Sequence, residues 1–194
     1  MQYSEGRHGR VFVLRIDDGE DFLAVTRDFI KDRAVQAGTL IFLGALRQGR
    51  MVTGPEELVI PPEPHYVMFE GGWEMVGIGT IYPGEDGPAI HYHASVGRAG
   101  HALTGCLRGK AITYIVAEII VLEFTGLEIR RLPDEKNGLV LPVHGTHSGT
   151  RSQPAAPSGT STPKEEPVPE TKEDVDEPGG LAEIIRDLTR RPRT

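Results

Sequence analysis

The spacing of apolar residues predicts a strand, a helix and a second strand at the start of the chain. Residues 10–16 (RVFVLRI) and 39–49 (TLIFLGALRQG) are apolar runs typical of strands. Between them, apolar side chains recur at helical spacing from Glu20 until a C-terminal signal near Ala37 and Gly38. We expect this helix to pack on the core. Gly44, inside the second run, indicates a bulge or a close approach of two backbones.

Further strands are predicted between residues 65 and 124, after a proline-rich loop over residues 54–64. Two short strands cover 65–69 and 74–82, and three consecutive strands fill 89–124. No alternation of strands and helices follows the first helix. The pattern therefore favours an α+β fold with a mostly antiparallel sheet of about seven strands and one main helix.

The run over residues 110–124 is apolar on both alternating faces, which predicts a central strand. Glu118 lies in one of these apolar rows. Because burying an unpaired charge is costly, we expect Glu118 to have a partner such as an arginine, a histidine or a bound ion.

After Val143 the sequence becomes rich in Ser, Thr, Pro, Gly and acidic residues. Residues 144–178 have almost no apolar side chains to bury, which predicts a disordered linker after a domain over residues 1–143. Residues 179–194 predict a short amphipathic helix with a basic end. A helix this short is marginal in water, so the segment is either a frayed tail or a helix that folds when residues 180–191 dock on the core or on a partner. Its apolar stripe consists of Leu181, Ile184, Ile185 and Leu188.

Candidate metal ligands gather in the predicted hairpin. His91 and His93 are two residues apart, so on a strand both imidazoles point to the same face. If residues 97–100 form the loop, Cys106 faces His91 on that side. His101 then points to the other face, although a one-residue slip would exchange the two, so His101 is the reserve ligand.

Three nitrogen and sulfur ligands with an open fourth position are typical of catalytic zinc. A polar strand face and a small buried cysteine would account for the same residues without a metal. Zinc suits this ligand set best, and copper or iron would also fit it.

The segments HYHASVGR, LTGCLRG and AEIIVLEF resemble the PPC family, the plant and prokaryote conserved domain. The resemblance covers about residues 10–130 and includes the segment VGIGTIY. The family's Gly-Gly-His is Thr104-Gly105-Cys106 here, so a thiol replaces the third histidine of its metal-bound prokaryotic members. The resemblance implies a homotrimer and a bound metal, with Glu118 as the glutamate of the last strand. The AT-hook core of the plant relatives is missing.

Acidic residues outnumber basic ones, 28 to 21, for a net charge of −7. Residues 1–143 contain 19 acidic and 14 basic side chains, a net of −5. This balance argues against autonomous binding to DNA unless a local basic patch forms. The candidates for such a patch are Arg47, Arg50, Arg98, Arg108 and Lys110.

The single cysteine rules out an intramolecular disulfide and suits a reducing compartment. No signal peptide and no apolar run of membrane-spanning length stand out. We therefore expect a cytoplasmic protein.

Three functions fit this sequence. The one we favour is a metal-binding, self-associating module of the PPC type, tied to DNA or to regulation. The alternative is a small zinc-dependent enzyme of the hydrolase type, with Glu118 or Glu70 as general base. The third is a scaffold whose C-terminal helix recruits a partner to a trimeric core.

Overall fold

The computed structural model describes residues 1–145 of the chain. The predicted helix over 179–194 and nearly all of the predicted linker over 144–178 lie outside these residues. The elements are β1 (Arg7–Asp17), α1 (Phe22–Asp32), β2 (Gly38–Val52), β3 (Tyr66–Gly84), β4 (Gly87–Arg98), β5 (His101–Thr125), β6 (Ile129–Asp134) and β7 (Leu139–His144).

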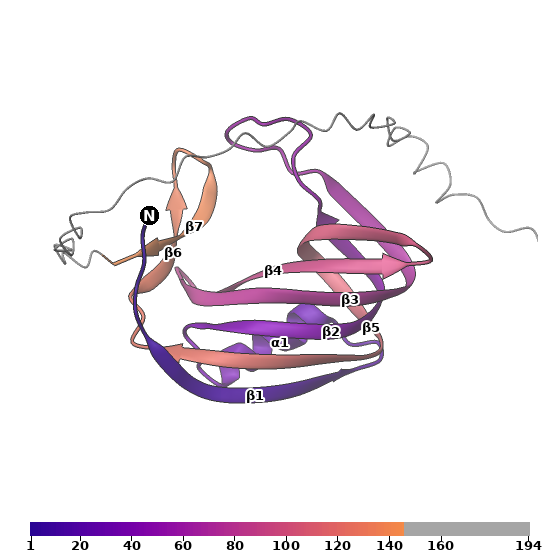
Figure 1. Cartoon of the computed structure of the whole chain (residues 1–194), viewed down its shortest axis with the longest axis horizontal. Helices are drawn as coiled ribbons and strands as arrows, with labels where there is room; N and C mark the ends of the chain where they lie inside the picture. The colour runs from indigo at the N-terminus through magenta and orange to yellow at the C-terminus, as the bar shows by residue number, and fades with distance from the viewer. Residues whose placement is uncertain (146–194) are drawn as a thin grey trace, which may run out of the picture. The chain divides into compact units, whose positions relative to one another are not determined.

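The strands form one main antiparallel sheet and one separate hairpin. The main sheet has the order β1-β5-β2-β3-β4, and β4 also pairs with the first part of β5, so the sheet curls into a barrel-like form (Figure 1). β6 and β7 form the separate hairpin. The predicted mostly antiparallel sheet with one helix is confirmed, and the predicted central strand β5 lies between β1 and β2.

Helix α1 begins at a capping aspartate. The Asp21 carboxylate accepts hydrogen bonds from the backbone N–H groups of Leu23 and Ala24, which otherwise lack partners at a helix start. The helix ends at Asp32, several residues before the predicted stop, because Ala34 takes a left-handed conformation with φ of 51°. Within residues 1–145, no helix has both the length and the apolar character that crossing a membrane requires.

Two pairs of predicted strands are continuous in the structure. The segments 65–69 and 74–82 both belong to β3, and the glycines between them bend the strand without ending it. The last two predicted strands both belong to β5. In β5 the regular alternation is interrupted, since Ile115 has a φ of 63° and Ile112 and Thr113 are both buried. Gly44 of β2 sits at a register shift, where a Cβ would overlap the carbonyl oxygen of Val116.

Within residues 1–145, the two sides of the main sheet differ in how they are covered. α1 packs on the inner side, where Phe22 contacts the rings of Phe42 and Tyr92. The opposite side, the outer face, carries a set of exposed apolar side chains that we call the apolar face. Its members are Val11, Val13, Ile41, Leu43, Val76, Ile78 and Ile120.

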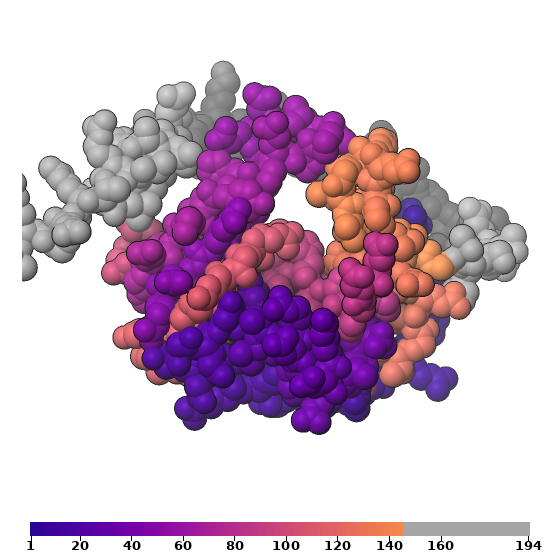
Figure 2. Space-filling model, turned by 180° about the vertical axis from the view of Figure 1, so that it is seen from behind, coloured from indigo at the N-terminus to yellow at the C-terminus, as the bar shows by residue number. Residues whose placement is uncertain are grey.

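An arch stands beside the main sheet. One side of it is the segment 53–65 and the other is the β6–β7 hairpin, with a hollow between them (Figure 2). The two sides meet where Pro61 packs against Gly138, so closely that a Cβ on Gly138 would lie 2.9 Å from the Cβ of Pro61. Both sides of the arch meet the sheet next to predicted metal ligands. The segment 53–65 leaves the sheet opposite Cys106, and the β6–β7 hairpin touches it beside His91.

Candidate metal centre

The tight β4–β5 hairpin positions the predicted metal ligands. Its loop is only Ala99 and Gly100, both with positive φ (50° and 83°), and Arg98 pairs directly with His101. Two positive φ values are what a two-residue hairpin of this twist requires. The strands then pair up to His93, which lies opposite Cys106.

This register corrects the predicted one. With residues 97–100 as the loop, Cys106 was expected opposite His91, but the shorter loop places it opposite His93. The difference is two residues, and an even shift leaves every side chain on its predicted face. Cys106 therefore remains on the side of both histidines, and the reserve ligand His101 lies on the other face of the hairpin.

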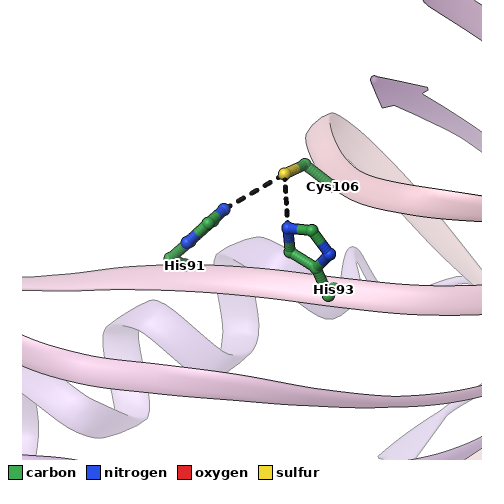
Figure 3. A group of neighbouring side chains, drawn as sticks. All are labelled: His91, His93 and Cys106. Atoms are coloured by element: carbon green, nitrogen blue, oxygen red, sulfur yellow. Dashed lines mark hydrogen bonds between the residues drawn. The ribbon is translucent and has the colours of Figure 1, made fainter. Parts of the chain in front are cut away.

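The three side chains converge on one point (Figure 3). The Sγ atom of Cys106 lies 3.1 Å from Nε2 of His91 and 2.9 Å from Nε2 of His93. One ligand atom from each side chain lies within 4.8 Å of the others, and the two imidazole rings are nearly perpendicular at 84°. In tetrahedral zinc the sulfur and nitrogen ligands are about 3.5 Å apart, so the set fits the ion after a small opening.

The electrostatic surroundings favour a neutral His91. Burial is the main cause that lowers the pKa of His91 to about 4, and the neighbouring Arg108, Arg131 and His93 act in the same direction. A neutral imidazole has a free lone pair, which is the form that binds a metal. His91 is thus ready to act as a ligand at neutral pH.

Arg131 is a residue of this site that the sequence analysis missed. It comes from β6, and its Nη2 donates a 2.8 Å hydrogen bond to Oγ1 of Thr80, the cross-strand neighbour of His91. Only 8% of Arg131 is exposed, and its guanidinium faces the ring of Tyr82. No motif marks it, since it is one of two adjacent arginines in a segment with no predicted structure.

The five predicted basic residues do not share one environment. Arg50 and Arg108 are cross-strand partners, and Lys110 is exposed two residues further along β5. Arg47 instead pairs with the Asp18 carboxylate. Arg98 donates a 3.1 Å hydrogen bond to the carbonyl oxygen of Glu70. The structure therefore brings only part of the predicted patch together, beside Cys106.

Glu118 lies away from the metal ligands. It is exposed on the outer face, contrary to the expected burial, and its cross-strand partner is Arg15. Strands β2 and β3 separate it from His93, a distance of roughly 14 Å at the usual strand spacing. Within one chain it cannot act as the general base of this site. Glu70, the other predicted base, is exposed on β3 and uses its backbone carbonyl to hold Arg98.

Solved structures with the same fold include proteins from two archaea. A metal-containing protein from Archaeoglobus fulgidus is 24% identical, with a TM-score of 0.66 over 74% of this chain and 100% of its own. A plant- and prokaryote-conserved protein from Pyrococcus horikoshii is 25% identical, with a TM-score of 0.66 over 75% of this chain and 99% of its own.

A bacterial protein from Bacteroides thetaiotaomicron, named as a DNA-binding candidate, is 20% identical, with a TM-score of 0.59 over 72% of this chain and 97% of its own. A search of curated proteins gave no match. The model of the Plants and Prokaryotes Conserved domain matches residues 3–125, more than half of the chain. The protein therefore belongs to the Plants and Prokaryotes Conserved (PPC) domain family.

Proposed function

We propose that this protein is a zinc-binding, self-associating PPC module with a regulatory role. The observation that carries the proposal is the convergence of His91, His93 and Cys106 on one point of the hairpin. Two imidazoles and a thiolate are preferred ligands of zinc. A thiol ligand has to stay reduced, which suits the cytoplasm.

Metal content tests the proposal directly. Elemental mass spectrometry of the purified protein should find about one zinc per chain. Cys106→Ser should lose most of it, while the control His101→Ala should keep it, because His101 lies on the other face of the hairpin. Equal zinc in the wild type and in Cys106→Ser would remove the basis of the proposal.

Self-association is supported by the apolar face. At 76% exposed, Val13 begins a row in which Ile120, Ile41 and Ile78 are successive cross-strand partners. Contiguous apolar surface of this kind is rarely left open to water in a stable monomer. A homotrimer, which the family resemblance implies, would cover it.

Direct contact with DNA is not part of the proposal. Residues 1–143 have a net charge of −5, and Arg47, a predicted DNA contact, pairs with an acid. A regulatory role then rests on self-association and on the metal, and not on a basic surface.

A zinc-dependent enzyme is the second candidate. The specific observation in its favour is that three ligands would leave a coordination position free, on a site next to Val52, where the segment 53–65 leaves the sheet. A water molecule in that position would need a base from outside the set, and Glu118 is too far away in the same chain. Hydrolysis of ester substrates that is lost in His93→Ala, with assembly intact, would establish this reading.

A further inference from the structure

An unusual group of arginines surrounds the candidate metal centre. Arg108 follows Cys106 by two residues and shares its face of β5, on the side toward His91. Arg131 reaches the same place from β6 through its bond to Thr80. The domain is acidic as a whole, so a cluster of cations here is a local feature and not a reflection of composition.

Arg131 lacks the partners that a buried cation normally has. Its side chain is more than nine-tenths buried, yet Nε has no hydrogen-bond partner, and the bond from Nη1 to the carbonyl oxygen of Val140 is long at 3.5 Å. Among residues 1–145, no carboxylate lies within ion-pair distance of it. Burying an unpaired guanidinium is costly, which points to a missing anion.

Arg108 and Arg50 are exposed, and they also lie close to other positive charges. They are directly opposite one another on β5 and β2, an arrangement of like charges that is unfavourable unless something lies between or above them. Neither has a carboxylate partner in the described part of the chain. Arg50 stacks on the ring of Tyr66, with its guanidinium carbon 3.7 Å from the ring centre, which fixes its position.

These arginines affect one another and the metal ligands. Burial is the main cause that lowers the pKa of both His91 and Arg131. Arg108 and Arg131 add to the effect on His91, and the charge of Arg108 adds to the effect on Arg131. Two of the groups that act on His91 are therefore cationic guanidinium groups. With a zinc ion and one thiolate added, the centre would hold roughly three positive charges in a small volume.

The arch gives this cluster a defined place. The segment 53–65 leaves the sheet at Val52, the cross-strand partner of Cys106, and the β6–β7 hairpin touches the sheet through Arg131 and Thr80 beside His91. The two segments that border the hollow (Figure 2) therefore meet the sheet beside Cys106 and His91. Pro61 and Gly138 close the arch at its far end.

We propose that this hollow binds the phosphate group of a small molecule, held by Arg108 and Arg131 beside the metal. The proposal rests on the zinc site argued above. Phosphate supplies the two negative charges and several oxygen acceptors that a metal and two guanidinium forks require, and arginine matches it bidentately. A closed arch admits a small phosphate, whereas a DNA duplex lays its backbone along an open surface.

Calorimetric titration of the zinc-loaded protein with inorganic phosphate, in a phosphate-free buffer, tests the inference. We expect one phosphate per chain. Arg108→Gln and Arg131→Lys should each bind it about tenfold more weakly or worse, since each loses charge-assisted hydrogen bonds. Arg130→Gln is the matched control. It removes one positive charge, as Arg108→Gln does, but at an exposed position next to Arg131, and it should change phosphate binding by less than about twofold.

Zinc content and melting temperature are measured on every variant. If Arg131→Lys fails to fold, the exposed Arg108→Gln decides the question alone. A protein that takes up zinc but no phosphate, or an Arg130→Gln as weak as Arg108→Gln, overturns the phosphate site and leaves the zinc proposal standing. A protein that takes up no zinc overturns both.

A second titration separates the two sources of phosphate. A short DNA duplex should neither bind to the zinc-loaded protein nor displace inorganic phosphate from it. Competition between the duplex and phosphate that Arg108→Gln abolishes would assign the arginines to nucleic acid and refute a small-molecule site.

Discussion

The outer face of the sheet has two regions with opposite chemistry, joined at one cross-strand pair. The apolar face ends at Ile78 of β3, and its partner His93 of β4 begins the metal centre. The centre depends on a few atoms placed within 4.8 Å of one another. The apolar face depends on the summed area of seven side chains and on no single contact.

This difference determines how each region fails. A metal site loses its function when any one ligand is removed, since zinc needs every donor. An interface formed by apolar area tolerates the loss of a methyl group and is broken by a buried charge. Substitutions at the boundary between the regions should therefore affect them separately.

The largest expected effect comes from His93→Leu, which extends the apolar row and removes a ligand. Zinc affinity should fall more than about 100-fold, because even outer-shell changes at zinc sites cost 10–100-fold. Self-association should persist or strengthen. Competition with a coloured chelator measures the affinity, and Ser95→Val, which adds apolar surface on the same face without removing a ligand, is the control. Equal loss of zinc in both variants would mean that the surface, and not the imidazole, matters.

An effect of similar size is expected at the centre of the apolar face. Ile41→Glu would bury a carboxylate without a partner, which costs on the order of 3–5 kcal/mol, enough to separate the subunits at micromolar concentration. Zinc content should not change. Sedimentation analysis distinguishes the states, with Asp28→Lys on the exposed side of α1 as the control. An Ile41→Glu protein that sediments as the wild type would exclude this face as the interface.

The same two regions show what the sequence can and cannot predict. The gathering of His91, His93 and Cys106 on one face could be predicted because strand alternation depends only on odd or even spacing, so a register error of two residues left Cys106 on the same face as both histidines. The central position of β5 could also be predicted, because the apolar residues of 110–124 lie on both faces of the strand. Apolar spacing, however, does not say what covers a face, and Glu118 was expected to be buried although it is exposed in the part of the chain that the structure describes.

Arg131 was beyond the reach of pattern analysis. Its hairpin carries Pro133 and Pro142, and proline normally argues against a strand. The residue becomes meaningful only when β6 meets Thr80 of β3, some fifty positions earlier in the sequence. Contacts between residues so far apart in the sequence leave no local periodicity. The place of Arg131 beside Arg108 could therefore be identified only from the three-dimensional structure.

The smallest expected effect is on the pH dependence of folding stability. It tests whether His91 is shielded from solvent in the folded chain. In the folded metal-free protein the pKa of His91 is about 4, below the value near 6.5 of a free histidine. The unfolded chain therefore takes up its proton first. Stability is complete above about pH 6.5 and falls as the pH drops toward 4. His91→Gln has no such proton to take up.

Urea unfolding of chelator-treated protein at pH 7.5 and pH 5.0 measures this difference. The wild type should lose more stability than His91→Gln between the two values, by on the order of 1 kcal/mol once solvent screening is allowed for. The histidines outside the site contribute equally to both proteins and cancel in the comparison, and a His91→Gln, His93→Gln double variant compared with His93→Gln removes the influence of the neighbouring ring. Identical losses would mean that His91 is as well solvated in the folded chain as in the unfolded one, and the desolvation attributed to the centre would then be wrong.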